Sequence, residues 1–119
     1  MNANERIDYL EYPSSDLAKT KAFFEAAFSW TFTDYGSEYT AFEGQGLTGG
    51  GGFYMADLAS KSHLGAALTV FYSEDIGATQ IKVEESGGVI VKPIFSFPGG
   101  RRFHFEEPSG NEFAVWTHE

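Results

Sequence analysis

Hydrophobic and polar positions in the first half of the chain change their period in a way that predicts several short elements. The pattern of residues 7–12 predicts a strand. Leu17, Thr20 and Phe24 then recur every three or four residues, which predicts an amphipathic helix over residues 16–28. Polar residues 13–16 precede it and supply N-cap chemistry. After this helix we expect a hairpin over residues 30–35 and 38–42, a glycine-rich loop over 44–52 and a fourth strand over 53–55.

The second half repeats this order of elements. Residues 66–72 are apolar and favour a strand, and a helix marked by Ile76, Thr79 and Val83 ends at the glycines of positions 87 and 88. A strand over residues 89–95 and a turn over residues 98–100 follow. The set closes with a hairpin whose turn is Pro108–Asn111, since proline fixes φ while glycine and asparagine tolerate positive φ.

An internal match supports a duplication. A shift of 59 residues, the difference between Asp16 and Asp75, also pairs Thr20 with Thr79. The order of elements is strand, helix and three strands in both halves, as expected for a repeated unit. We therefore predict one α+β domain with two tandem βαβββ modules, at residues 6–56 and 66–118, joined by a linker at residues 57–65.

Composition excludes several classes of function. Acidic residues outnumber basic ones 17 to 8, and the net charge of −9 opposes binding to nucleic acid. No apolar run reaches the roughly 20 residues that a membrane-spanning helix needs, so we expect no membrane partner. The chain contains no cysteine, which removes disulfide and thiolate chemistry. The expectation is a soluble protein of the cytoplasm.

The chain resembles the vicinal oxygen chelate superfamily, which includes glyoxalase I, bleomycin-resistance proteins and extradiol dioxygenases. The resemblance is carried, in order, by residues 9–17 leading into Ala22–Glu25, by residues 73–79, by residues 84–88 and by the turn in residues 105–113. It implies that the two modules form a curled mixed sheet around a pocket, with the helices outside. Members of this length are usually homodimers, so we expect a homodimer.

The metal-dependent members of this superfamily bind a divalent ion through four side chains that face into the sheet. The resemblance places these positions at Tyr9, Leu68, Ala114 and near Gly51. Three of these residues have no side-chain donor, and a neutral phenol is a poor ligand for such an ion. We therefore expect no metal and no other cofactor.

The lining of the pocket follows from strand alternation. Glu11 shares a face with Tyr9, Tyr72 shares one with Leu68, and Glu112 and Trp116 share one with Ala114. We predict a ligand-binding cup lined by Tyr9, Glu11, Leu68, Tyr72, Ala114 and Trp116. An aromatic lining with carboxylates suits a small organic ligand that is aromatic or cationic. The competing interpretation is that these aromatic side chains only fill the interior of the sheet.

Three functions remain open at this point. In the bleomycin-resistance branch, sequestering a ligand is itself the function, and this is the interpretation that we favour. The alternative is a glyoxalase-like lyase or isomerase that uses Glu11 or His104 as general base, which requires a buried Glu11 or a free His104 nitrogen facing the ligand. A third possibility is an interaction subunit whose pocket has lost its function.

Overall fold

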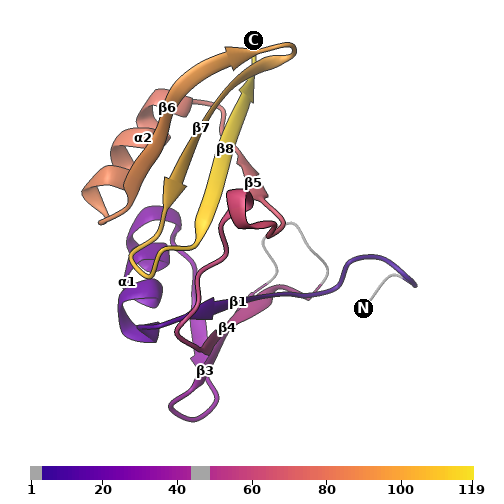
Figure 1. Cartoon of the computed structure of the whole chain (residues 1–119), viewed down its shortest axis with the longest axis vertical. Helices are drawn as coiled ribbons and strands as arrows, with labels where there is room; N and C mark the ends of the chain where they lie inside the picture. The colour runs from indigo at the N-terminus through magenta and orange to yellow at the C-terminus, as the bar shows by residue number, and fades with distance from the viewer. Residues whose placement is uncertain (1–3, 44–48) are drawn as a thin grey trace.

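The computed structural model describes residues 4–43 and 49–119 and shows an α+β fold of two βαβββ modules (Figure 1). Module one contains β1 (Leu10–Ser14), α1 (Leu17–Phe28), β2 (Phe32–Asp34), β3 (Tyr39–Phe42) and β4 (Gly51–Met55). Module two contains β5 (Thr69–Tyr72), α2 (Ile76–Glu85), β6 (Val89–Phe97), β7 (Gly100–Glu106) and β8 (Glu112–His118). The connecting segment carries a 3₁₀ turn, η1 (Ser62–Leu64). The predicted fold class and tandem arrangement are confirmed.

Each module forms its own four-stranded sheet with the same topology. The strand orders are β1-β4-β3-β2 and β5-β8-β7-β6. In both sheets the first strand pairs in parallel with the last strand of its module, and the other pairs are antiparallel. Figure 1 shows the sheet of module two upright, the strands of module one crossing below it, and both helices on one side.

The helix caps confirm the duplication at the level of single atoms. The Asp16 side chain accepts a hydrogen bond from the backbone N–H of Lys19 at 3.1 Å. At the equivalent place in module two, Asp75 accepts one from the N–H of Ala78, also at 3.1 Å. Each carboxylate satisfies one of the N–H groups that the first turn of a helix leaves without a partner.

A contact between a serine and a threonine hydroxyl also occurs in both modules. In module one, the threonine makes a further hydrogen bond to the last hairpin. Ser14 Oγ lies 2.8 Å from Thr20 Oγ1, and Ser73 Oγ lies 2.7 Å from Thr79 Oγ1. In module one, Thr20 also donates to the carboxylate of Glu107 at 2.9 Å. Glu107 is 1% exposed and belongs to the turn between β7 and β8. A buried hydrogen bond therefore joins the start of α1 to the last hairpin.

The same turn is held to module one by its asparagine. Asn111 is fully buried, and its Nδ2 donates to the carbonyl oxygen of Pro13 and to Glu107, both at 2.7 Å. Gly110 has φ of 97°, so the predicted turn with a left-handed glycine is confirmed.

Helix α1 supplies aromatic side chains to a core that both sheets share. The Phe24 ring lies 5.6 Å from the ring of Phe53 in β4 and 5.4 Å from that of Phe113 in β8. Phe23 lies 5.7 Å from Phe105 of β7. All five rings are at most 1% exposed. Each sheet therefore buries one face against this core; we call the opposite face the outer face of its module.

Several boundaries differ from the sequence prediction, and those of β1 and β4 matter most for the site. Strand β1 begins at Leu10 rather than at residue 7, and β4 begins inside the glycine run, so the prediction that the loop reaches residue 52 is wrong. Gly51 and Gly52 pair with Leu10 and Glu11. A side chain at Gly51 would collide with the carbonyl oxygen of Leu10, which explains why this strand uses glycine. Residues 44–48 of the predicted loop lie outside the described residues.

The helices of the described residues are short. α1 has 12 residues and α2 has 10, and neither has the length and hydropathy that crossing a membrane requires.

Candidate functional site

The outer face of module one is set by strand register. Tyr12 of β1 points into the core, where its ring stacks on Phe53 with centroids 5.3 Å apart. Alternation along the strand therefore places Tyr9 and Glu11 on the outer face, as predicted. Tyr39 of β3 reaches the same face, because its hydroxyl contacts the side chains of both residues.

Three side chains on this face form a hydrogen-bonded chain. The hydroxyl oxygens of Tyr9 and Tyr39 lie 2.5 Å apart, and the Tyr39 hydroxyl donates to the Glu11 carboxylate at 2.9 Å. Burial, and then the bonds to Tyr9 and Glu11, raise the pKa of Tyr39 above its ordinary value. Tyr39 therefore stays protonated over the physiological pH range and bridges the other two groups.

The backbone below this chain has to be glycine. A Cβ at Gly52 would collide with the Tyr39 hydroxyl and would lie 2.9 Å from the Tyr9 hydroxyl. The two phenols therefore lie directly against strand β4. The sequence prediction missed Tyr39 and Gly52. Alternation through residues 38–42 was the available signal for Tyr39, whereas Gly52 requires the register between β1 and β4.

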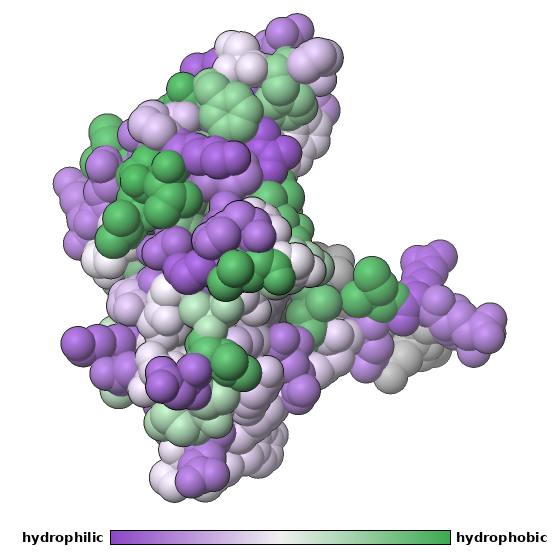
Figure 2. All heavy atoms as spheres, in the orientation of Figure 1, coloured by the Kyte–Doolittle hydropathy of each residue, from purple (hydrophilic) through white to green (hydrophobic). Residues whose placement is uncertain are grey.

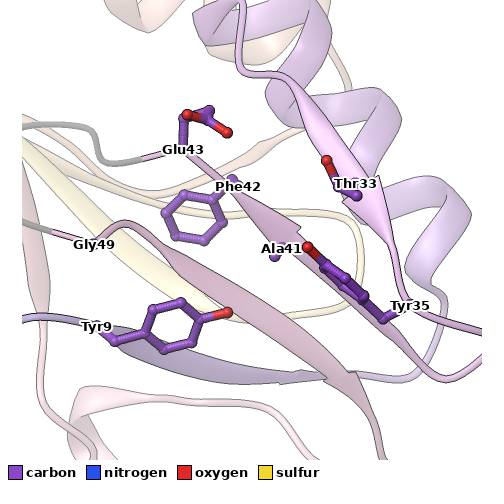
Figure 3. A pocket seen from close by; sticks show the side chains of 7 residues that line it. All are labelled: Tyr9, Thr33, Tyr35, Ala41, Phe42, Glu43 and Gly49. Carbon is purple, nitrogen blue, oxygen red and sulfur yellow. The ribbon is translucent and has the colours of Figure 1, made fainter.

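A hollow of about 410 Å³ lies beside the chain of phenols (Figure 3). Tyr9 and Tyr35 lie on two sides of the hollow with their hydroxyl ends turned toward one another. Glu43 lies at the end of β3, beside Phe42. Tyr35 is 65% exposed, so its ring offers a free face. The lining consists of Tyr9, Thr33, Tyr35, Ala41, Phe42, Glu43 and Gly49.

Only Tyr9 of the six predicted ligand-binding residues lines this hollow. Glu11 is not part of the lining, but it is connected to Tyr9 by hydrogen bonds through the hydroxyl of Tyr39. The others belong to module two: Tyr72 and Trp116 pack edge to face with centroids 5.3 Å apart, half-buried Leu68 precedes β5, and Ala114 is fully buried. Within one chain the structure thus forms two clusters, and ligand binding by these six residues stays a prediction.

The outer face of module two carries a second polar network. His104 Nδ1 lies 2.9 Å from Glu112, and Arg102 Nε donates to His104 Nε2 at 3.1 Å. Because Nε2 accepts, the proton lies on Nδ1 and is donated to Glu112. His104 is 5% exposed and both its nitrogens are engaged. A role as general base requires one of these two hydrogen bonds to open, and catalysis by His104 stays a prediction.

The connecting segment covers this network. The backbone N–H and the hydroxyl of Ser62 both donate to Glu112 at 2.8 Å. Burial raises the pKa of Glu112, but the hydrogen bonds from His104 and Ser62 outweigh it and lower the pKa to about 2. Lys61 pairs with Glu106 at 2.7 Å. The linker between the modules is thus fastened across one end of the module-two sheet.

Apolar side chains are exposed on module two. Figure 2 shows hydrophobic side chains among hydrophilic ones on the side of module two where α2 and β6 run. Val89 is 60% exposed, Val91 40% and Phe95 39%.

The strand register fixes the positions that correspond between the modules. Val70 pairs with Ala114 in module two, and Glu11 pairs with Gly52 in module one. The counterpart of Ala114 is therefore Gly52, one residue beyond the predicted Gly51.

The four positions at which metal-dependent relatives hold an ion do not fit one in this chain. Leu68, Ala114 and Gly52 have no side-chain donor, and the Tyr9 hydroxyl is bonded to Tyr39. In the described part of the chain, no group of three or more His, Cys, Asp or Glu side chains is placed to hold a metal.

The paired βαβββ modules define a class of protein, and comparison with known families agrees. A model of the Glyoxalase/Bleomycin resistance protein/Dioxygenase superfamily matches residues 6–115, and the chain belongs to this superfamily. Comparison with curated protein sequences finds no match.

Solved structures share the fold at low sequence identity. A glyoxalase-related enzyme from Fulvimarina pelagi aligns with a TM-score of 0.76 and 15% identity over 96% of this chain and 88% of its own. A glyoxalase/bleomycin resistance protein/dioxygenase family enzyme from Burkholderia phytofirmans gives 0.77 and 13% over 95% and 100%. A fosfomycin resistance protein from Listeria monocytogenes gives 0.73 and 20% over 100% and 96%. At these identities the likeness concerns the fold alone.

Proposed function

We propose that this chain is a metal-independent binding protein of the superfamily that sequesters a small aromatic cation. The observation that carries the proposal is the hollow on the outer face of module one. Its volume of about 410 Å³ lies within the usual range of small-molecule sites, and Tyr9, Tyr35 and Glu43 line it. Tyrosine faces and a carboxylate attract a cation that carries an apolar group.

The proposed active form is a homodimer in which the outer face of module one meets that of module two of its partner. Glu11 and Glu43 make the first face acidic, while Lys92 and Arg102 lie on the second. Two such contacts related by a twofold axis form a closed dimer with two equivalent sites. This arrangement would also bring Tyr72 and Trp116 of one protomer toward Tyr9 of the other. The lack of cysteine suits a reducing compartment, and we place the protein in the cytoplasm.

Calorimetric titration of metal-stripped protein with small aromatic cations tests this function. We expect binding without added metal, and about fivefold weaker binding in Tyr35→Ala, because loss of a cation–π contact costs about 1 kcal/mol. Tyr54→Ala is the matched control, since Tyr54 is an exposed tyrosine of the same sheet outside the lining of the hollow. Absence of binding, or binding that returns only with a divalent metal, would contradict the proposal.

A glyoxalase-like lyase or isomerase is the second candidate, and Glu11 is the observation that favours it. Its carboxylate lies on the outer face and accepts a hydrogen bond from Tyr39, which orients it to receive a proton from a bound substrate. Glu11 is exposed in the single chain, so the burial that this role requires would have to come from the bound substrate or from a partner subunit. Turnover of hemithioacetals by the wild type that disappears in Glu11→Gln would establish this activity. Binding without turnover would leave sequestration as the function.

A further inference from the structure

The chain of Tyr9, Tyr39 and Glu11 fixes where its hydroxyl protons point. A carboxylate only accepts hydrogen bonds, so the proton of Tyr39 is directed to Glu11. The oxygen of Tyr39 then accepts the proton of Tyr9 across 2.5 Å. Both phenolic protons are therefore used inside the chain. The raised pKa of Tyr39 supports this order, because the bridging phenol keeps its proton.

The oxygen atoms of these three hydrogen-bonded side chains consequently have no proton left to donate to a ligand, and they can only accept hydrogen bonds. Tyr9 is 39% exposed and lines the hollow, and a lone pair of its hydroxyl oxygen is available there. The carboxylate of Glu11 adds negative charge at the other end of the chain. Neither lysine nor arginine is among the described residues that line the hollow.

The backbone holds this arrangement in place. Gly52 leaves room for the Tyr39 and Tyr9 hydroxyls against β4, and any side chain there would displace them. The hydrogen bonds among Tyr9, Tyr39 and Glu11 therefore depend on the glycine that strand pairing places beneath them.

We infer that the hollow of module one selects cations that carry N–H groups, meaning primary or secondary ammonium compounds, over quaternary ammonium compounds. The inference rests on the proposed function, because it assumes that the hollow binds a small molecule. An N–H group donates to the Tyr9 oxygen, while the cationic group also lies against the ring of Tyr35. A quaternary ammonium ion has the same charge but no donor, so it gains only the cation–π contact.

Calorimetric titration with benzylammonium, benzyltrimethylammonium and benzyl alcohol tests this selectivity. We expect benzylammonium to bind roughly tenfold more tightly than benzyltrimethylammonium, because only benzylammonium donates a hydrogen bond from a charged group. In Tyr39→Phe the Tyr9 hydroxyl loses its acceptor and is free to donate into the hollow. We expect the preference for benzylammonium to weaken in this variant, because the Tyr9 hydroxyl is no longer held as an acceptor. Tyr54→Phe is the control and keeps the preference, since Tyr54 lies outside the chain.

The outcomes separate this inference from the proposed function. Equal affinities for the two ammonium compounds would overturn the donor selectivity and leave the binding function standing. An unchanged preference in Tyr39→Phe would also overturn it, because the selectivity would then have another source. Binding of none of the three probes would overturn the proposed function itself. Circular dichroism and thermal unfolding of each variant confirm that it is folded.

Discussion

Glu11 of module one and Val70 of module two occupy equivalent positions, as do Gly52 and Ala114, yet the two outer faces differ in chemistry. Module one carries phenols and a carboxylate around a hollow. Module two has an apolar side chain at the equivalent position, and its polar network is covered by the linker residue Ser62. The helix caps, in contrast, are the same in both modules. The two modules therefore share the contacts that begin their helices and differ on their outer faces.

The largest effect is expected from removing the ring that both modules share. Phe24→Ala leaves a cavity between the two sheets, and large-to-small changes of a buried phenylalanine cost about 3–5 kcal/mol. Chemical denaturation should show this loss as one transition, since both sheets pack on the ring. Tyr35→Ala, at an exposed tyrosine, should change the free energy of unfolding by less than about 1 kcal/mol. Two separate transitions in Phe24→Ala would show that the modules unfold independently.

The hydrogen bonds that His104 and Ser62 make with Glu112 in module two should make the free energy of unfolding depend on pH. The pKa of Glu112 is about 2 in the folded protein, below its ordinary value of 4.5. Ionised Glu112 therefore stabilises the fold above about pH 4.5, and this contribution is lost as the pH falls toward 2. Chemical denaturation at several pH values should show that the free energy of unfolding falls less steeply with acid in Glu112→Gln than in the wild type.

Glu11→Gln is the control in module one. Glu11 is exposed, and its acid-side profile should match that of the wild type. If Glu112→Gln followed the wild type equally closely, the network would contribute nothing to acid stability.

Adjacent glycines of β4 should separate stability from binding. Gly51→Ala pushes a methyl group into the backbone of Leu10, and overpacking of this kind costs about 1–3 kcal/mol. Gly52→Ala meets the end of the Tyr39 side chain, which can move, so we expect a smaller loss of stability. It should nevertheless weaken the preference for benzylammonium. Thermal unfolding and calorimetric titration measure the two effects, and similar losses of stability would contradict this assignment.

The smallest effect should be the same in both modules. Asp16→Ala and Asp75→Ala each remove one cap hydrogen bond of 3.1 Å, and each should cost about 1 kcal/mol. Chemical denaturation should give equal losses for both, within the error of the method. A marked inequality would show that the modules differ in their folding as well as in their outer faces.

Sequence patterns predicted the architecture because they act locally. The spacing of Leu17, Thr20 and Phe24 and the cap chemistry of Asp16 are visible in a single segment, and the structure confirms both. The turn at Pro108–Asn111 is equally local. Strand ends were less predictable, since the glycines of β4 carry no hydrophobic pattern.

The site could be predicted only in part because it depends on register between strands. Alternation correctly placed Tyr9 and Glu11 on one face. The bridge through Tyr39 over Gly52 needs β1, β4 and β3 aligned to the residue, and no short pattern contains that information. The hydrogen bonds of His104 could not be predicted for the same reason, because Arg102 and Glu112 reach its nitrogens only after β7 and β8 have paired.

The buried bonds between the start of α1 and the last hairpin have a consequence for how the chain folds. Thr20 and Glu107 are 87 residues apart in sequence, and Pro13 and Asn111 are 98 apart. Contacts of such separation form only after a large loop has closed, which slows folding and couples its two ends. Native-state hydrogen exchange should therefore find that the amides of β1 and β8 open together. Neither module should fold stably when it is expressed without the other.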